Sequence, residues 1–333
     1  MRILVYGLGA LGKVFAGFLK KAGHEVYAIG RKKFVQPIRE KGLKITGIWG
    51  SHHIDLKEVY EKIDELPVKD FDLVVLTVKS YDTERALEDL KKVNFKYLLL
   101  AQNGYGNYEK ATSVFGKEKV ILSRVIFGAQ ILEPGHVKVT VIADDVVIGN
   151  PDGAIKEEVL KKLAQTLREA GIPTRYEPTV YQYLWDKILY NSALNPLGAL
   201  LEVNYGTLAK LEETRQLMDR IIEEIFAVAQ AKGIKLFYKN AEEYKKHFYE
   251  KLIPPTAEHY PSMLQDIKAG KPTEIEALNG AIVRLGREVG IPTPVNEVIT
   301  QLVKAKEKLN LKNNSTHPKG LVNALGKNLI FQQ

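Results

Sequence analysis

Residues 1–23 read MRILVYGLGALGKVFAGFLKKAG, and this stretch decides the fold of the first half of the chain. An apolar run at Ile3–Tyr6 is followed by a glycine-rich turn and then by a pattern typical of an amphipathic helix, which ends near Gly23. The turn consists of Gly7, Leu8, Gly9, Ala10, Leu11 and Gly12. A buried strand, a tight turn and a helix are therefore predicted here.

Each glycine of this turn meets a separate physical requirement of a dinucleotide-binding loop. Gly7 permits the tight turn, Gly9 leaves room for a pyrophosphate, and Gly12 lets the helix lie close to the strand. The helix N-terminus then offers unpaired N–H groups and a positive dipole end to phosphates. Between a strand and a helix, GxGxxG is the Rossmann fingerprint, so we predict that residues 7–12 bind a dinucleotide. A tight turn without a ligand is the alternative.

The rest of the first half alternates apolar runs with helical patterns. The predicted strands are Glu25–Ile29, Leu73–Val78, Tyr97–Ala101 and Val120–Ile126, and helices are predicted at Ala10–Lys21 and Thr83–Lys92. This alternation indicates βαβ units, that is, a parallel sheet with helices on both faces. Gly42–Leu56 predicts a small antiparallel hairpin, and Val137–Ile142 and Val146–Ile148 predict antiparallel edge strands.

The second half has almost no strand pattern. Helical periodicity marks Tyr181–Leu201, Glu213–Lys232, Glu274–Val289 and Asn296–Lys308. We predict a Rossmann-type domain at residues 1–177 and a mostly α-helical domain at residues 178–333, with Asn195-Pro196 kinking or ending its first helix. The tail after about residue 310 reads as loosely ordered, although Leu321, Leu325, Leu329, Ile330 and Phe331 suggest that part of it packs back.

Composition limits the possible functions. The 333 residues are 45% hydrophobic and 26% charged, with a net charge of +8 and no cysteine. Basic and acidic residues are interleaved, which favours a mixed solvated surface over a nucleic-acid site. The lack of cysteine excludes disulfides, thiolate zinc sites and cysteine nucleophiles, and no metal site is expected. Neither a signal peptide nor a membrane helix is predicted, so the expected location is the cytoplasm.

Three basic residues follow the second predicted strand. An NAD site would carry Asp or Glu there, whereas this chain has Arg31, Lys32 and Lys33. A guanidinium can clamp a 2′-phosphate and stack on adenine, so we predict NADPH over NADH. Lys79 and Asn103 follow later strands and should lie at the carboxyl edge of the sheet, although a solvated lysine and simple turn chemistry explain them equally well.

One predicted helix carries a polar stripe among apolar residues. Lys187, Asn191 and Asn195 are spaced at i, i+4 and i+8, so they share one helix face. A lysine in a dry site is a good proton donor, and two carboxamides could bind a keto acid, although spacing alone slightly favours a solvent-facing stripe. Further on, Thr273 and Glu276 match a Thr-x-x-Glu capping box, which gives Glu276 a complete structural explanation.

Taken together, these segments resemble the ketopantoate reductase family over roughly residues 1–310. The resemblance rests on residues 7–12, Arg31, Val78-Lys79, Gln102-Asn103-Gly104, Gly128-Ala129, Trp185-x-Lys187-x3-Asn191-x3-Asn195-Pro196-Leu197, Ser262-Met263-Leu264-Gln265-Asp266 and Thr273-Glu274-Ile275-Glu276-x2-Asn279-Gly280, in the family's order. The asparagine run combined with Ser-Met-Leu-Gln-Asp is the specific part, and the glycine motif is not. The family often has a further substrate asparagine where this chain has Tyr205, with Asn204 one residue early.

The resemblance implies the reduction of 2-dehydropantoate by NADPH to (R)-pantoate, a step toward pantothenate and coenzyme A. Lys187 would be the general acid. Asn191, Asn195 and Ser262 would bind the substrate, with Asn103 and Asn204 as further candidates. Residues 7–12, Arg31, Asn103 and Ala129 would contact NADP(H), with Lys79 nearby, and Glu276 would help to hold substrate or cofactor near the nicotinamide. Closing the two domains would exclude water.

Two other hypotheses stay open. Another 2-keto acid dehydrogenase or an opine-type dehydrogenase could use the same architecture with a different small keto acid. A non-catalytic NADP(H)-binding sensor would not need Lys187 at the site. The expected partners are the substrate and a possible second copy of the chain, and neither a nucleic acid nor a membrane.

Overall fold

The computed structural model describes residues 1–316, with side chains described to residue 310. The chain forms two compact units that divide between Ile188 and Leu189, inside helix α6 (Val180–Leu201). The domain boundary expected after residue 177 falls just before this helix and stays a prediction. The expected packing of the apolar residues from Leu321 onward lies outside the described residues.

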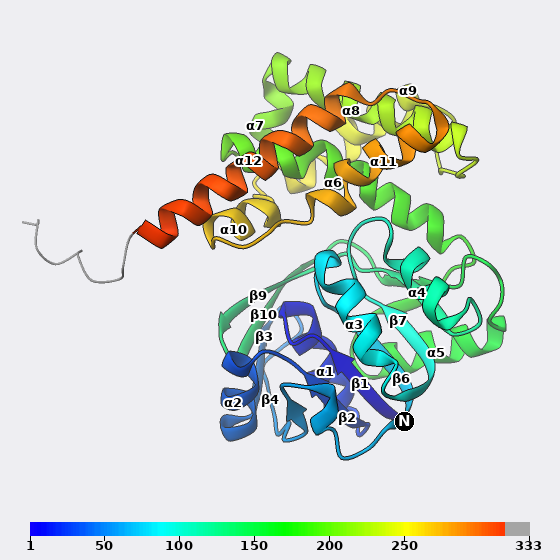
Figure 1. Cartoon of the computed structure of the whole chain (residues 1–333), viewed down its shortest axis with the longest axis vertical. Coiled ribbons are helices and arrows are strands. Elements are labelled where there is room, and N and C mark those ends of the chain that lie inside the picture. Colours follow the sequence, from blue (N-terminus) through cyan, green and yellow to red (C-terminus); the bar gives the residue numbers. More distant parts are fainter. Residues whose placement is uncertain (317–333) are drawn as a thin grey trace, which may run out of the picture. The chain divides into compact units, whose positions relative to one another are not determined.

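The first unit is built on an eight-stranded sheet in the order β12-β11-β8-β7-β6-β1-β2-β5 (Figure 1). The strands are β1 (Arg2–Tyr6), β2 (Glu25–Ile29), β5 (Val59–Tyr60), β6 (Asp70–Leu76), β7 (Asn94–Leu100), β8 (Val120–Arg124), β11 (Val146–Gly149) and β12 (Thr174–Tyr176). From β8 to β5 every neighbouring pair is parallel, as the βαβ pattern predicts. β11 is antiparallel to β8 as expected, but it is not an edge strand, because β12 pairs along its other side.

A second, smaller sheet has the order β4-β3-β10-β9. Its strands are β3 (Leu43–Gly47), β4 (His52–Ile54), β9 (Phe127–Glu133) and β10 (His136–Ile142). The predicted hairpin is confirmed as β3 and β4, but β10 lies in this sheet and not at the edge of the main one. The close pairing of β10 with β3 needs Gly47, where an added Cβ would lie 1.9 Å from the Val139 carbonyl oxygen.

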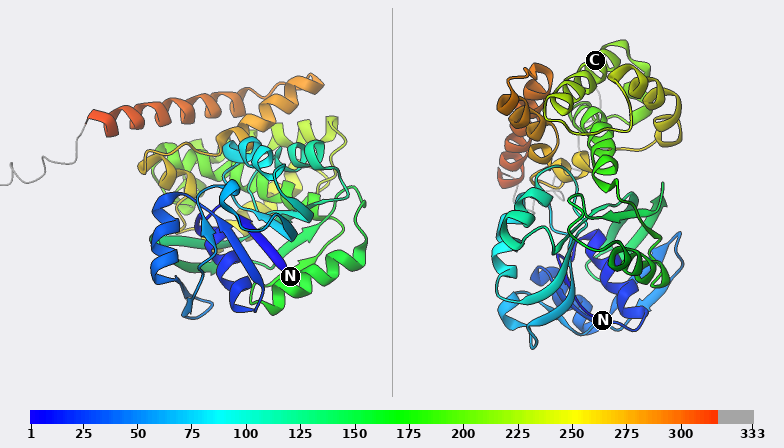
Figure 2. Two further views of the ribbon diagram at one scale, coloured as in Figure 1. Left: turned by 60° about the horizontal axis from the view of Figure 1, so that its bottom comes forward. Right: turned by 90° about the vertical axis from the view of Figure 1, so that its right-hand side faces the viewer.

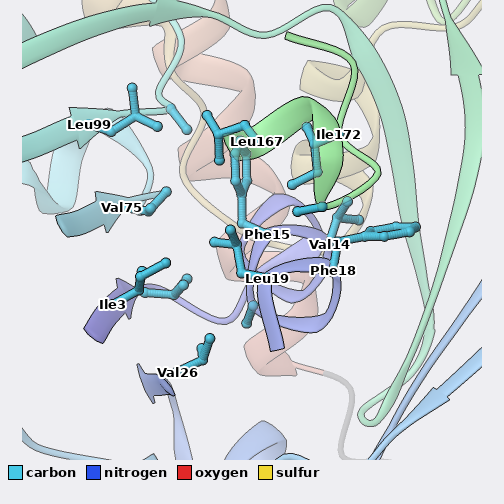
Figure 3. Close-up of a cluster of buried hydrophobic side chains, with 14 of the residues drawn as sticks. Ile3, Val14, Phe15, Phe18, Leu19, Val26, Val75, Leu99, Leu167 and Ile172 are labelled. Atoms are coloured by element: carbon cyan, nitrogen blue, oxygen red, sulfur yellow. The ribbon is translucent and has the colours of Figure 1, made fainter. Parts of the chain in front are cut away.

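Helices α1 (Ala10–Lys21), α2 (Lys32–Lys41), α3 (Thr83–Leu90), α4 (Asn107–Phe115) and α5 (Glu157–Glu169) complete the first unit. Figure 3 shows Phe15, Phe18 and Leu19 of α1 in the core with side chains of the sheet and of α5. The opposite side of α1 contacts β3, β9 and β10, so the helix is buried between the two sheets. This burial fixes the glycine turn that begins the helix.

In the described part of the second unit, all regular secondary structure is helical. After α6 come α7 (Tyr205–Lys210), α8 (Glu212–Ala231), α9 (Ala241–His247), α10 (Ser262–Lys268), α11 (Asn279–Val289) and α12 (Pro294–Thr316), the long orange-to-red helix of Figure 2. Pro196 lies inside α6 and does not end it, although the sequence had predicted that Asn195-Pro196 would kink or end this helix. Proline cannot bond the carbonyl four residues earlier, and here the Asn279 amide donates to that Ser192 oxygen at 3.0 Å. None of the described helices is long and apolar enough to cross a membrane.

Candidate active site

The glycine turn after β1 packs tightly at Gly7 and Gly12 and leaves open space beside Gly9. Gly7 adopts φ +114°, and its carbonyl accepts a hydrogen bond of 2.5 Å from the Thr77 hydroxyl. An added Cβ at Gly12 would lie 1.7 Å from that carbonyl oxygen, whereas one at Gly9 would meet nothing within 4 Å. Helix α1 starts at Ala10 without a side-chain cap. The first N–H groups of α1 and the open position at Gly9 therefore fit a pyrophosphate.

Sequence reasoning missed Lys13, the residue directly after the turn. Its side chain is 0% exposed, its Nζ donates to the Leu8 carbonyl at 2.6 Å, and it lies 3.4 Å from the centroid of the Phe34 ring. Burial, and then the charge of Lys33, lower the pKa of Lys13 to about 7. A lysine between apolar residues on a helix that must pack against a sheet was the clue in the sequence.

The basic residues after β2 stand at the start of α2. Arg31 is the N-cap residue of this helix, and its exposed guanidinium lies 3.9 Å from the Asp82 carboxylate. Lys79 follows β6 and is half-buried. Ala129 pairs with Val139 in the second sheet. Arg31 is thus at the carboxyl end of β2, as an adenosine-phosphate contact requires, and it is solvent-accessible.

Asn103 and Lys187 are brought together, although 84 residues separate them in the chain. The Lys187 Nζ donates to the Asn103 Oδ1 at 2.5 Å and also to the Val125 carbonyl. Asn103 follows β7 and Val125 follows β8. The lysine of α6 is therefore held at the carboxyl edge of the parallel sheet, where ligands of this fold bind, and it is half-buried, not the solvent-facing group that spacing alone favoured.

A chain of hydrogen bonds fixes Asn103. The Gln102 amide donates to the Thr83 hydroxyl, which donates to Asn107 Oδ1, both at 2.8 Å. The Asn107 amide then donates to the Asn103 carbonyl at 2.9 Å. Because Gln102, Thr83 and Asn107 are all buried, the loop that carries Asn103 is rigidly placed. Turn chemistry alone does not explain this asparagine.

The remaining predicted substrate residues belong to the second unit. Asn191 is half-buried and Asn195 is buried, both on α6, whereas Ser262 is the exposed first residue of α10. Asn204 Oδ1 caps α7 by accepting from the Thr207 N–H at 3.0 Å. The neighbouring Tyr205 is buried, and its hydroxyl donates to Asn195 Oδ1 at 2.6 Å.

Glu276 does not cap a helix, contrary to the capping-box interpretation. Thr273 bonds the Glu307 carboxylate instead, Ile275–Ala277 form a 3-10 turn, and α11 begins only at Asn279. The half-exposed Glu276 carboxylate binds Arg284 at 2.7 Å and Lys304 at 2.5 Å. Burial raises the pKa of Glu276, but these two cations outweigh it and lower the pKa overall. Glu276 is therefore an ionised carboxylate.

The fold and the glycine turn are those of the Rossmann-type class of dinucleotide-binding proteins. The family model described as ketopantoate reductase PanE/ApbA matches residues 3–153, and the model of its C-terminal part matches residues 179–307. The chain belongs to the ketopantoate reductase family.

Similar proteins support this membership over nearly the whole chain. The 2-dehydropantoate 2-reductase of Aquifex aeolicus is 57% identical and covers 94% of this chain and 99% of its own length. That of Pyrococcus abyssi is 35% identical, with coverages of 94% and 100%. A solved PanE/ApbA family ketopantoate reductase of Ralstonia eutropha JMP134 has a TM-score of 0.82 at 32% identity, covering 93% and 99%. D-mandelate dehydrogenase with NADH and anilino(oxo)acetate has a TM-score of 0.83 at 30% identity, with the same coverages.

Proposed function

We propose that this chain catalyses the NADPH-dependent reduction of 2-dehydropantoate to (R)-pantoate. The observation that carries the proposal is the Lys187 ammonium group, held by Asn103 and Val125 at the carboxyl edge of the sheet. Membership of the ketopantoate reductase family supports the substrate. A sensor without turnover would not need a lysine held in this way, so an enzyme is favoured.

Lys187 acts as the general acid. When bound, the nicotinamide supplies the hydride that the carbonyl carbon of the substrate accepts. As that bond forms, the electron pair of the C=O bond moves to oxygen, and the Lys187 Nζ delivers the proton that makes the hydroxyl group. Until the proton moves, the ammonium charge stabilises the negative charge that develops on the oxygen. Asn103 and Val125 keep the Nζ in one place, so little reorganisation is needed.

Asn191, Asn195 and Ser262 bind the keto acid, and Asn103 contacts both substrate and cofactor. Asn204 has its oxygen engaged by α7, which leaves its amide group, itself 3.3 Å from Glu258, as its contact to a substrate. The Glu276 carboxylate, balanced by Arg284 and Lys304, helps to hold substrate or cofactor. These roles rest on the matching positions of the family motifs, except that of Asn204, which stands one residue before the family's position.

For the cofactor, we propose NADP(H) bound by residues 7–12, Arg31, Lys79, Asn103, Ala129 and Glu276. Support for NADPH over NADH comes from the exposed guanidinium of Arg31 after β2, with Lys32 and Lys33 beside it and no acidic residue at the strand end. The homodimer and the cytoplasmic location stay predictions.

A second candidate is the reduction of another 2-keto acid with a larger side chain. The likeness to D-mandelate dehydrogenase, which was solved with NADH and anilino(oxo)acetate, favours this alternative. It would use the same lysine and the same hydride transfer, so only the substrate and the cofactor preference would differ.

The test is a panel of substrates, in which oxidation of NADPH and of NADH is followed by absorbance with ketopantoate, 2-ketoisovalerate, pyruvate and phenylglyoxylate. We expect the highest kcat/KM with ketopantoate and NADPH. A preference for phenylglyoxylate would replace the first function by the second. Tight NADPH binding without oxidation by any of the four keto acids would overturn both.

A further inference from the structure

A tyrosine, Tyr205, stands where the family often has a further substrate asparagine, and its hydroxyl bonds another side chain of the same unit. Tyr205 is 3% exposed and Asn195 is 7% exposed. The Tyr205 hydroxyl donates to the Asn195 Oδ1 at 2.6 Å, so a side chain of α7 holds a carboxamide of α6. Both residues lie in the second compact unit.

The local backbone leaves Tyr205 little freedom. Asn204 caps α7, so Tyr205 is the first residue of that helix. The N–H of Tyr205 donates to the His259 carbonyl at 3.1 Å, and the N–H of Gly206 donates to the Ala257 carbonyl at 2.8 Å. An added Cβ at Gly206 would lie 3.0 Å from the Ala257 Cβ, so this close approach suits glycine.

Aromatic packing fixes the ring as well. The Tyr205 ring lies 5.9 Å from the Tyr190 ring and 5.3 Å from the His259 ring, centroid to centroid. Tyr190 has a hydroxyl of its own, which bonds the Thr256 hydroxyl at 2.6 Å and not Asn195. The chain therefore holds two neighbouring tyrosines, the buried Tyr205 and the half-buried Tyr190, of which only Tyr205 bonds the candidate substrate residue.

A primary carboxamide is nearly symmetric in shape, but its two ends differ chemically. The oxygen only accepts hydrogen bonds and the NH₂ group only donates them. A donor fixed on the oxygen therefore decides which end faces the opposite side. Because burial raises the pKa of the Tyr205 hydroxyl, and the neighbouring Tyr190 raises it further, this group stays a protonated donor.

We propose that Tyr205 is a positioning residue, whose hydroxyl turns the Asn195 carboxamide so that its NH₂ group donates to an acceptor oxygen of the keto acid. This inference rests on the proposed function, because it takes Asn195 as a substrate residue. The carboxylate and the hydroxyl of ketopantoate share the required acceptor chemistry. A flipped carboxamide would present its own oxygen to that acceptor and would repel it.

The experiment compares Tyr205→Phe with the matched control Tyr190→Phe in the full chain. Each variant keeps its ring and loses one hydrogen-bonded hydroxyl. We expect Tyr205→Phe to raise the KM for ketopantoate about tenfold, the scale of one misdirected hydrogen bond, with the KM for NADPH and the Tm close to those of the wild type. Tyr190→Phe should leave both KM values unchanged. Repeating the assay with 2-ketoisovalerate, which lacks the hydroxyl, distinguishes the two acceptors, because an equal rise identifies the carboxylate and a smaller rise the hydroxyl.

An unchanged KM for ketopantoate in Tyr205→Phe, with an active wild type, would overturn the positioning role. Equal rises in both variants, or a parallel rise in the KM for NADPH, would also overturn it, since they would indicate a general effect on packing. Failure of the proposed function is seen separately, because the wild type would then not reduce ketopantoate.

Discussion

Lys13 and Lys187 both belong to the first unit and each donates to a backbone carbonyl, yet their surroundings give them opposite characters. Lys13 of α1 is 0% exposed, bonds the Leu8 carbonyl and lies over the Phe34 ring. Lys187 of α6 is half-buried and bonds the Val125 carbonyl and the Asn103 side chain. A fully enclosed ammonium cannot meet a substrate without rearrangement, whereas a partly exposed one can. We therefore expect Lys13 to affect stability and Lys187 to affect turnover.

The largest expected effect is on turnover. Lys187→Ala should lower kcat by about 10² to 10⁴-fold, because it removes the proton donor and the charge that stabilises the developing alkoxide. Lys13→Met should keep kcat within about threefold at saturating NADPH, since a buried lysine below the turn does not reach the reacting carbonyl. Steady-state kinetics with NADPH and ketopantoate measure both variants.

Equal losses of kcat in the two variants would contradict the different roles assigned to Lys13 and Lys187. Circular dichroism and the Tm must accompany the assay, so that a loss of folding is not read as a loss of catalysis. A Lys187→Ala variant that keeps its Tm and the wild-type kcat would remove Lys187 from the chemistry.

The two parts of the first unit differ in how far the sequence could predict them. The parallel strands follow from runs of buried apolar residues, and their pairing follows from the βαβ alternation. The position of β10 could not be predicted, because its partner β3 lies about 90 residues earlier, as the pair Val137 and Ile45 shows, and no local pattern encodes that pairing. Similarly, β11 was predicted to be an edge strand because the sequence did not reveal its pairing with β12.

In the candidate site, too, local features could be predicted from the sequence and long-range contacts could not. A dinucleotide role for residues 7–12 could be predicted because it depends on local geometry, in which backbone conformation and spacing are enough. Asn103 and Lys187 needed the structure, since their bond joins distant segments. From the sequence, Tyr205 was only a departure from the family pattern. The structure shows that its hydroxyl bonds the Asn195 side chain. Glu276 matched a local motif well, but Thr273 bonds Glu307, a residue of a distant helix, and the cap does not form.

Arg31 differs from Lys13 and Lys187 because its guanidinium is exposed. The Arg31→Ala variant should raise the KM for NADPH about tenfold or more, because one charge-assisted hydrogen bond to the 2′-phosphate is lost. The KM for NADH should change little, so the preference for NADPH should shrink. Lys41→Ala, at the other end of α2, changes the net charge equally and is the matched control. The same rise in KM for both cofactors would mean that Arg31 does not bind the 2′-phosphate.

The smallest effect concerns Lys13 and pH. Folding lowers the pKa of Lys13 from 10.5 to about 7, so the unfolded chain binds this proton more tightly. The resulting cost to stability is complete below about pH 7 and disappears as the pH rises toward 10.5. Replacing Lys13 by Met removes this pH-dependent cost, whatever constant cost the lost hydrogen bond to Leu8 adds.

The difference in Tm, Lys13→Met minus wild type, should therefore fall by several degrees between pH 7 and pH 9.5, taking about 2–4 °C per kcal/mol for a unit of the size of Met1–Ile188. Differential scanning fluorimetry across this range measures it. Lys21→Met changes an exposed lysine of the same helix, and its Tm difference should stay constant. A constant difference for Lys13→Met as well would mean that the ammonium of Lys13 is as well solvated as that of Lys21. The contrast with Lys187 would then rest on hydrogen-bond partners alone and not on burial.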